Sequence, residues 1–306
     1  MVTFKDIEIA HNRISKYVYN TPIMTSKTLN NDTGAKLFFK CENFQKTGSF
    51  KIRGATNAIL QLKKADIPKG IITTSSGNHG AAVSYTAREI GATSQVIMPE
   101  NTPKNKINNV KRYGGKIIFC EPNIKSREQT LEKIVNKSGA SIIHPYNDEK
   151  IIAGQGTAAK ELIEEVPDLD AIICPVSGGG LLSGTLLSAK ELKPNLEVFG
   201  AEPKNADDTY RSILNNKIMS NTTTNTIADG LRAQLGSITF PIIKNNVNSI
   251  LLVSEEMIIN SMYLIWQILK IIIEPSCSIV LAALLLNSEK FIDKKVGLIL
   301  TGGNYD

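Results

Sequence analysis

Short apolar runs alternate along this chain with longer segments of helical period. Runs of about 4–8 apolar residues are consistent with strands buried in a sheet, and apolar residues three or four positions apart are typical of helices. Helical spacing is clear at 79–90 and at 128–135. The alternation predicts an α/β fold with parallel sheets. The predicted strands are 37–41, 70–74, 95–98, 116–120, 141–144, 171–176, 197–202, 250–253 and 296–301.

No repeat, low-complexity block or long linker divides the chain. Two domains are therefore expected to be interwoven rather than arranged in series. Residues 70–147 contain four of the predicted strands, and they are predicted to form a small domain inserted into a larger one that comprises 1–69 and 148–306. A cleft between the two domains is the expected ligand site.

Composition argues against several classes of protein. The formal net charge of the 306 residues is +6, and no basic block interleaved with aromatic residues indicates nucleic-acid binding. No uncharged apolar stretch reaches the length of about 18 residues that spans a membrane, and the N-terminus lacks the apolar core of a signal peptide. The four cysteines are far apart, as expected for free thiols in a reducing compartment. We therefore expect a cytoplasmic protein without nucleic-acid or membrane partners.

The segment 49–54, Ser-Phe-Lys-Ile-Arg-Gly, follows a predicted strand and leads into a helical stretch. Phe50 and Ile52 flank Lys51, so its amine is expected to be partly buried. Burial lowers the pKa of an amine, and a neutral amine can form a Schiff base with a carbonyl cofactor. A solvated surface lysine is the alternative, because most lysines are exposed.

Two further loops join a predicted strand to a helix. The loop 75–80, Ser-Ser-Gly-Asn-His-Gly, can bind an anion such as a carboxylate through N–H groups at the helix start; an ordinary helix cap is the alternative. The loop 177–184, Ser-Gly-Gly-Gly-Leu-Leu-Ser-Gly, is neither a Walker loop nor a dinucleotide fingerprint. Its glycines let several N–H groups converge on the phosphate of a small cofactor, and close strand–helix packing is the alternative.

Two weaker features also follow predicted strands. Thr301 begins a Thr-Gly-Gly-Asn turn and can offer a neutral hydrogen bond to a ring nitrogen, although taken alone the motif is better explained as a C-terminal turn. Glu202 ends a strand and is followed by Asp207 and Asp208. Carboxylates with a backbone carbonyl suit Mg²⁺ or Ca²⁺, and an acidic helix start is the alternative.

In this order the motifs resemble the fold-type II pyridoxal-phosphate (PLP) enzymes, specifically the serine racemase and serine/threonine dehydratase family. The resemblance extends over nearly the whole chain. It implies a tryptophan-synthase-β-like fold of two interwoven parallel-sheet domains, PLP as cofactor, and a homodimer. The matching motifs are 40–51, 75–80, 152–157, 177–181, 201–208, 227–230, 274–276 and 301–304.

The resemblance also implies residue roles. Lys51 matches the lysine that holds PLP and removes the α-proton, and Ser76 matches the serine that faces this lysine across the cofactor in racemases. The implied cofactor-binding residues are Phe50, Lys51, Asn78, Ser177, Gly178, Gly179, Gly180, Leu181, Glu274 and Thr301. The implied substrate-binding residues are Ser75, Ser76, Asn78, His79 and Arg127. The implied Mg²⁺ or Ca²⁺ ligands are Glu202, the Ala206 carbonyl and Asp208.

Two positions depart from the family pattern. Ser177 stands where a fourth glycine is often found, which weakens the prediction that its amide contacts the phosphate. Ala81 stands where nucleotide-activated racemases have glutamine, so activation by a nucleotide is not predicted.

The leading functional hypothesis is PLP-dependent β-elimination of L-serine, L-threonine or a 3-hydroxyaspartate to a 2-oxo acid and ammonia. Racemisation of serine or an aspartate-like amino acid, with Ser76 as the second proton donor, is the close alternative. A non-catalytic protein that binds PLP or an amino acid is the alternative of another class, but such a protein has no need of Lys51, Ser76 and Arg127 together. A nicotinamide oxidoreductase is disfavoured because no dinucleotide fingerprint is present.

Overall fold

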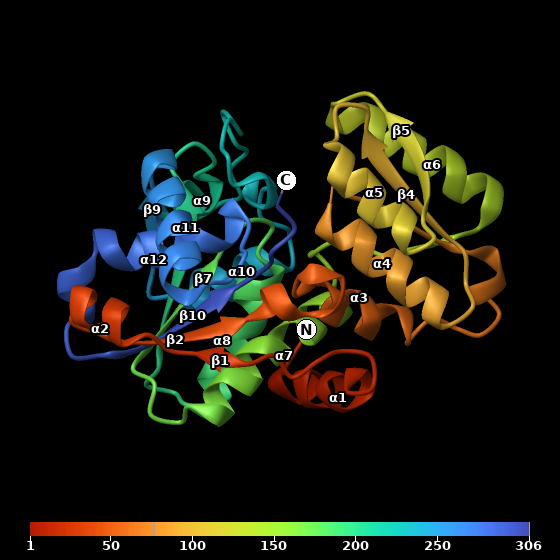
Figure 1. Cartoon of the computed structure of the whole chain (residues 1–306). Helices are drawn as coiled ribbons and strands as arrows, with labels where there is room; N and C mark the ends of the chain where they lie inside the picture. Colours follow the sequence, from red (N-terminus) through yellow and green to blue (C-terminus); the bar gives the residue numbers. More distant parts are fainter. Residues whose placement is uncertain (76, 306) are drawn as a thin grey trace.

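The chain forms two separate β-sheets (Figure 1). The computed structural model describes residues 1–75 and 77–305, apart from the side chain of Ile124. Strand order is β1-β2-β10-β7-β8-β9 in the six-stranded sheet and β5-β4-β3-β6 in the four-stranded sheet, and every described pair is parallel except β1 with β2. The strands are β1 (Ile23–Met24), β2 (Lys36–Cys41), β3 (Ile71–Thr74), β4 (Ser94–Pro99), β5 (Lys116–Cys120), β6 (Ser141–Ile142), β7 (Ala171–Pro175), β8 (Glu197–Pro203), β9 (Ser249–Val253) and β10 (Lys295–Leu300).

The predicted α/β fold with parallel sheets is confirmed, and all nine predicted strands are present. The prediction of 141–144 was too long, because β6 pairs with β3 only through Ser141 and Ile142. The two-residue strand β1 was not predicted, since so short a segment carries no alternation of apolar and polar residues.

Helices connect the strands along most of the chain. The α-helices are α1 (Phe4–Ile14), α2 (Lys27–Thr33), α3 (Lys51–Ile59), α4 (Asn78–Glu89), α5 (Lys104–Arg112), α6 (Ile124–Ser138), α7 (Glu149–Glu165), α8 (Gly180–Leu192), α9 (Asp208–Leu214), α10 (Thr239–Asn246), α11 (Glu255–Leu269) and α12 (Pro275–Leu286). The 3₁₀ turns are η1 (Glu42–Phe44), η2 (Lys46–Gly48), η3 (Ile67–Lys69), η4 (Asp229–Leu231) and η5 (Ser288–Phe291). Local sequence fixes several ends: the Asp148 side chain accepts from two backbone N–H groups at the start of α7, and Gly139 adopts a left-handed conformation after α6.

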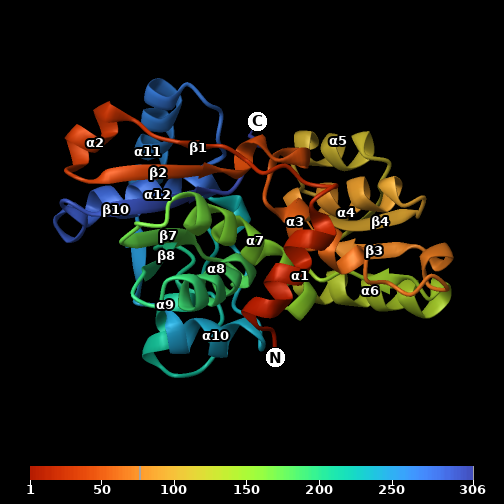
Figure 2. The ribbon, with the colours of Figure 1, turned by 90° about the horizontal axis from the view of Figure 1, so that it is seen from below.

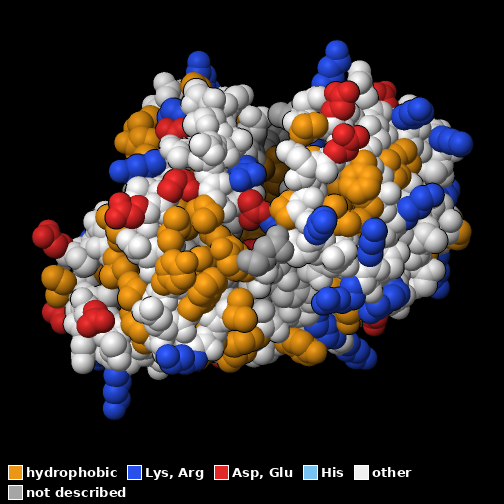
Figure 3. All heavy atoms as spheres, turned by 45° about the horizontal axis from the view of Figure 1, so that its top comes forward, with side chains coloured by type: hydrophobic (Ala, Val, Ile, Leu, Met, Phe, Trp, Pro, Cys, Tyr) orange, Lys and Arg blue, Asp and Glu red, His pale blue; other side chains and the backbone are white. Residues whose placement is uncertain are grey.

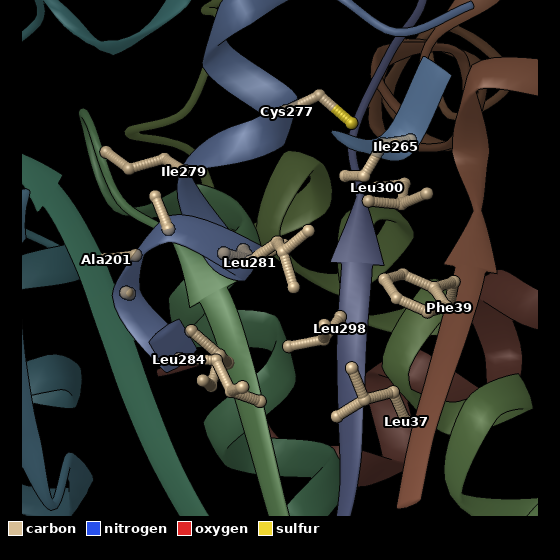
Figure 4. Close-up of a cluster of buried hydrophobic side chains, with 14 of the residues drawn as sticks. Leu37, Phe39, Ala201, Ile265, Cys277, Ile279, Leu281, Leu284, Leu298 and Leu300 are labelled. Atoms are coloured by element: carbon tan, nitrogen blue, oxygen red, sulfur yellow. The ribbon is translucent and has the colours of Figure 1, made fainter. Parts of the chain in front are cut away.

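The six-stranded sheet is buried on both faces, as parallel sheets usually are. Along β7, Ala171 and Ile173 face α11 and α12, whereas Ile172 and Cys174 face α7 and α8. Figure 2 shows the helices on opposite sides of this sheet, and Figure 4 shows the cluster that joins it to α12. All four cysteines are free and buried, consistent with the expected free thiols.

The four-stranded sheet contains the strands β3 to β6 and is covered by α4 and α5 on one face and α6 on the other. These strands all fall within residues 70–147. The division into an inserted small domain and a larger domain remains a prediction. None of the helices in the described residues is long and apolar enough to span a membrane.

Candidate active site

The loop that precedes Lys51 is paired with the segment that follows β10. The Phe50 N–H donates to the Thr301 carbonyl (3.0 Å), and the Gly303 N–H donates to the Gly48 carbonyl (3.0 Å). A β-bridge between Ser49 and Gly302 lies between these bonds. Two motifs about 250 residues apart therefore meet at the carboxyl end of the six-stranded sheet, which is where parallel sheets bind ligands. Figure 3 shows the surface hollowed between two lobes.

Lys51 is the first residue of α3, and its side chain is partly buried. Its Nζ donates to the Pro145 carbonyl (3.0 Å) and lies 5.1 Å from the centre of the Phe50 ring. Burial lowers the pKa of the Lys51 amine to about 8, although the nearby Glu274 carboxylate acts in the opposite direction. A substantial fraction of the amine is thus neutral near pH 8, and the neutral form is the nucleophile.

Glu274 and Asn78 form a hydrogen-bonded chain beside Lys51. Asn78 Nδ2 donates to Glu274 Oε1 (2.6 Å), and Asn304 Nδ2 donates to Asn78 Oδ1 (2.8 Å). Burial raises the pKa of Glu274 to about 7, while Lys106, Asn78 and Lys51 lower it. Glu274 Oε2 is buried without a protein partner. A buried polar atom of this kind normally has a partner, so this oxygen is available to a bound group.

Ser75 and Gly77 lie beside the start of α4. Ser75 Oγ accepts hydrogen bonds from the Gly77 N–H (3.2 Å) and the Gly80 N–H (3.0 Å) and so caps the turn. His79 is buried with Nε2 3.2 Å from the Ile143 carbonyl, and its Nδ1 has no protein partner. Burial and the charge of Lys51 lower the pKa of His79 to about 3, so its ring is neutral. Ser76 lies outside the described residues.

The glycine-rich loop opens α8. Gly179 has a left-handed φ of 88°, and a Cβ at Gly178 would lie 2.3 Å from the Tyr146 ring. A Cβ at Gly180 would lie 2.5 Å from Gln155 Oε1. Only glycines therefore fit this tightly packed loop, whose N–H groups begin a helix. The buried Leu181 follows in the first turn of α8.

Other predicted site residues have structural partners. Ser177 Oγ donates to the Ala233 carbonyl (3.2 Å) and accepts from the Ala233 N–H (3.1 Å), which ties the loop to a distant segment. Burial raises the pKa of Cys120 and of Tyr146, and the charge of Arg127 on α6 acts against this rise. The buried Nε of Arg127 has no protein partner among the described residues.

The structure brings the Glu202 and Asp208 carboxylates together and buries both. Glu202 accepts from the N–H groups of Thr209 (2.9 Å) and Tyr210 (2.9 Å) at the start of α9. Burial and the neighbouring Asp208 raise the pKa of Glu202 to about 8, and burial raises that of Asp208 to about 6. Ala206 lies buried in the intervening turn. Among the described residues, no three His, Cys, Asp or Glu side chains form a metal-binding group, so a cation here would need backbone or water oxygens.

Three residues near the site were not identified from sequence. Pro145 supplies the carbonyl that binds Lys51, and Tyr146 packs on the glycine-rich loop. Lys106 of α5 forms an ion pair with Asp229 and packs over Gly77. A backbone carbonyl, an isolated aromatic residue and one lysine in a lysine-rich helix carry no distinguishing pattern, so no signal in the sequence could have found them.

The chain matches the family model described as "Pyridoxal-phosphate dependent enzyme" over residues 14–302. It is 50% identical to serine racemase of Dictyostelium discoideum, with 100% of this chain and 95% of the relative covered. It is 48% identical to β-hydroxyaspartate dehydratase of Paracoccus denitrificans (99% and 96% covered). Among solved structures, maize serine racemase superposes with a TM-score of 0.97 at 44% identity, covering 100% of this chain and 94% of that one.

Proposed function

The chain belongs to the pyridoxal-phosphate dependent enzymes, and on that premise we propose that it converts L-3-hydroxy amino acids into a 2-oxo acid and ammonia by β-elimination. L-threo-3-hydroxyaspartate would give oxaloacetate, L-serine pyruvate, and L-threonine 2-oxobutanoate. One water leaves in the elimination and one is consumed when the released enamine hydrolyses, so the net products are the oxo acid and ammonia. The observation that carries the proposal is the Lys51 amine, whose pKa is lowered to about 8 between Pro145 and Glu274.

The residues present fit PLP. The loop 178–181 offers backbone N–H groups at the start of α8, and N–H groups at a helix start suit a phosphate. The buried Glu274 Oε2 lacks a partner beside Lys51 and Asn78. We propose that Phe50, Lys51, Asn78, Glu274 and Thr301 hold the ring and 177–181 hold the phosphate. When bound, PLP supplies a carbonyl for the amine and a conjugated ring that withdraws electrons from the substrate's α-carbon.

Lys51 is the group proposed to move the α-proton. A pKa of about 8 lies close to neutral pH, where a general base balances its neutral fraction against its basicity. The Pro145 carbonyl accepts a hydrogen bond from Nζ and so orients the amine. Thr301 is neutral, so a threonine contact at the ring nitrogen would not enforce its protonation. This favours prompt loss of the β-hydroxyl.

The α-carboxylate of the substrate is proposed to bind at the start of α4. Ser75, Asn78 and His79 lie at this helix start, and Ser76 is a further proposed ligand from the same sequence motif. Arg127 of α6 is proposed to supply a positive charge. Because His79 is neutral, it supplies no positive charge to the carboxylate, and Arg127 and the helix N-terminus are the proposed sources.

Racemisation is the second candidate, because relatives at 50% and 47% identity are named serine racemase. It requires a proton donor on the face opposite Lys51, and Ser76 is the proposed donor. Ser76→Ala should then abolish formation of D-serine and leave elimination of L-serine within about twofold, since elimination needs only Lys51 as base.

Three further properties are proposed. Glu202 and Asp208, with the Ala206 carbonyl, would bind Mg²⁺ or Ca²⁺, because two neighbouring buried carboxylates favour a cation between them. A homodimer is supported by exposed apolar side chains, which Figure 3 shows gathered on one lobe. Tyr263 of α11 is 50% exposed and Ile272, which follows α11, is 68% exposed. A cytoplasmic location is consistent with four buried free thiols.

The test is to assay purified protein with the three L-3-hydroxy amino acids for 2-oxo acid, and to follow serine by chiral chromatography. We expect oxo-acid release that disappears in Lys51→Ala, together with a near-ultraviolet to visible absorbance band that Lys51→Ala also loses. A band without oxo acid, accompanied by D-serine, would replace elimination with racemisation. Oxo-acid release at the wild-type rate in Lys51→Ala would contradict the proposal.

A further inference from the structure

A long irregular segment is fixed at both ends by one carboxylate. Residues 221–235, here called the strap, contain no regular element except the short turn η4. At its beginning, Asn221 Nδ2 donates to Asp208 Oδ1 (2.9 Å). At its end, the Leu235 N–H donates to Asp208 Oδ2 (3.0 Å). Asp208 is 1% exposed, so both hydrogen bonds are shielded from water. Together they hold the two ends of the strap close to each other.

Between these ends the strap contacts both sides of the candidate cofactor site. Ala233 exchanges two hydrogen bonds with the Ser177 hydroxyl at the start of the glycine-rich loop. The Gly230 N–H donates to Ser276 Oγ (2.9 Å), two residues from Glu274. The strap is therefore hydrogen-bonded both to the start of the glycine-rich loop and to the start of α12.

The middle of the strap also contacts the helix α5, which belongs to the part of the chain around the four-stranded sheet. Asp229 forms an ion pair with Lys106 of α5, which packs on the four-stranded sheet. The Lys106 side chain is 10% exposed and that of Asp229 is 29% exposed. Because the ammonium is largely removed from water, this pair is screened less than a surface ion pair.

Lys106 connects the ion pair to the loop that carries the predicted substrate ligands. A Cβ at Gly77 would lie 3.0 Å from Lys106 Cδ, so the lysine stem packs directly over Gly77. The Lys106 charge also lowers the pKa of Glu274. Lys106 thus lies between the strap, the loop 75–80 and the proposed cofactor site.

We propose that the strap, through the Asp229–Lys106 ion pair, positions Gly77 and the start of α4 beside Lys51, and that Asp208 holds the two ends of the strap. Lys106, Asp229 and Asn221 are positioning residues, because they act through the loop and not on the reacting atoms. The inference rests on the proposed function in one respect, namely that substrate binds at the loop 75–80. Loosening the strap should then weaken substrate binding more than it slows chemistry.

The first test is a double-mutant cycle on the ion pair in the PLP-loaded enzyme. Lys106→Met and Asp229→Asn should each raise KM roughly fivefold to tenfold, the lower range of coupling between sites, with kcat changed by no more than about twofold. The double variant should be no worse than the worse single variant, because both remove the same contact. Lys104→Met, on the exposed side of α5, is the matched control and should leave KM unchanged. Additive effects, or a fall in kcat at constant KM, would overturn the proposal.

The second test examines the contact of Asp208 with the strap without relying on turnover. Hydrogen exchange is compared between wild type, Asn221→Ala and the matched control Asn225→Ala, whose residue is exposed in the same segment. Asn221→Ala should speed exchange in the strap and also in residues 75–80 and in α5. Asn225→Ala should not speed exchange in residues 75–80 or in α5. Faster exchange confined to the strap would refute transmission to the loop. If wild type turned over none of the amino acids, the proposed function would fail, while this exchange experiment would still decide the role of the strap.

Discussion

Lys51 and Arg53 lie two residues apart in α3, yet their charged groups have opposite surroundings. Arg53 is fully buried and donates to both oxygens of Glu42 and both oxygens of Glu161, each at 2.7 Å. Lys51 donates to the neutral Pro145 carbonyl and forms no ion pair with any described residue. Burial alone would lower the pKa of both groups, but the two glutamates outweigh burial and raise the pKa of Arg53, whereas the pKa of Lys51 falls to about 8.

The difference shows that partner charge, not burial, separates a structural cation from a reactive one. Around Arg53, two glutamates face two cations, since Lys40 also pairs with Glu161 at 2.7 Å. A buried cluster of balanced charge is costly to disturb and inert at neutral pH. Around Lys51 the balance is missing, so the amine is poised to lose its proton.

Exchanging the reactive cation for arginine should produce the largest effect. Lys51→Arg keeps the positive charge, but a guanidinium neither forms the PLP linkage nor gives up a proton near neutral pH. We expect activity to fall by more than about 10³-fold, in the range attributed to loss of a general base and covalent attachment, and the absorbance band of bound cofactor to shift. Steady-state assays and an absorbance scan measure both.

The stability of Lys51→Arg separates chemistry from folding. The midpoint of urea unfolding of the cofactor-free protein should stay near that of wild type, because Lys51 has no ion pair with a described residue to lose. Wild-type activity in Lys51→Arg would show that the amine is not the reactive group.

Removing the structural cation should produce the next largest effect, on stability. Arg53→Met removes the cation that joins the buried Glu42 and Glu161, and Lys40 remains paired with Glu161 only. We expect a loss of about 3–5 kcal/mol in the free energy of unfolding. Urea denaturation of the cofactor-free protein measures it.

Arg53→Lys is the matched control for the charge itself. Lysine restores one positive charge but cannot supply the forked donors that bind two carboxylates, so about 1–3 kcal/mol should still be lost. A loss as large as that of Arg53→Met would mean that geometry alone stabilises this region. No loss in either variant would contradict the interpretation of the cluster as structural.

The Glu202–Asp208 pair is a third buried charge group, and it is unbalanced in the negative direction. Saturating Mg²⁺ or Ca²⁺ at about 100 times its Kd should stabilise the protein by about 2.7 kcal/mol, equivalent to roughly 5 °C in melting temperature. The reason is that a cation would supply the counter-charge that Arg53 and Lys40 supply to their glutamates. A calorimetric scan in chelator and in added cation measures the shift.

Glu202→Gln tests the assignment of that shift. The variant removes one proposed ligand, so the added cation should no longer change its melting temperature. An unchanged shift in Glu202→Gln would place the cation elsewhere, and no shift in wild type would remove the cation from the proposed function.

The sequence predicted the reactive cation but not the structural one. Lys51 stands in a local motif after a strand, and parallel topology brings strand ends together, so its proximity to 301–304 could be expected. Arg53 pairs with Glu161 across 108 positions, and nothing local distinguishes Glu161 from other helical glutamates. The same holds for the pairing of Lys106 with Asp229.

The fold was predictable for a related reason. Strands buried on both faces leave short apolar runs, and amphipathic helices leave a helical period. Both patterns can be recognised in the local sequence without knowledge of the tertiary contacts. The two-residue β1 and the irregular residues 221–235 have no period, so their positions depend on partners such as β2 and Asp208. The parts that the sequence left undetermined are therefore those whose positions depend on contacts with residues far away in the sequence.

The smallest predicted effect concerns the Glu274 carboxylate and the pKa of the Lys51 amine. Glu274 is the one described charge that raises the pKa of Lys51, against the larger lowering by burial. In cofactor-free protein, brief labelling of Lys51 by an amine-reactive reagent should rise with pH and reach half its maximum near pH 8, because only the neutral amine reacts. In Glu274→Gln the stabilising negative charge is gone, so the midpoint should move to lower pH.

Mass spectrometry of the peptide that contains Lys51 gives the midpoint, and Glu255→Gln, on a different element, serves as control. A midpoint that moved upward, or moved equally in the control, would show that Glu274 does not act on Lys51 and that burial alone sets its reactivity.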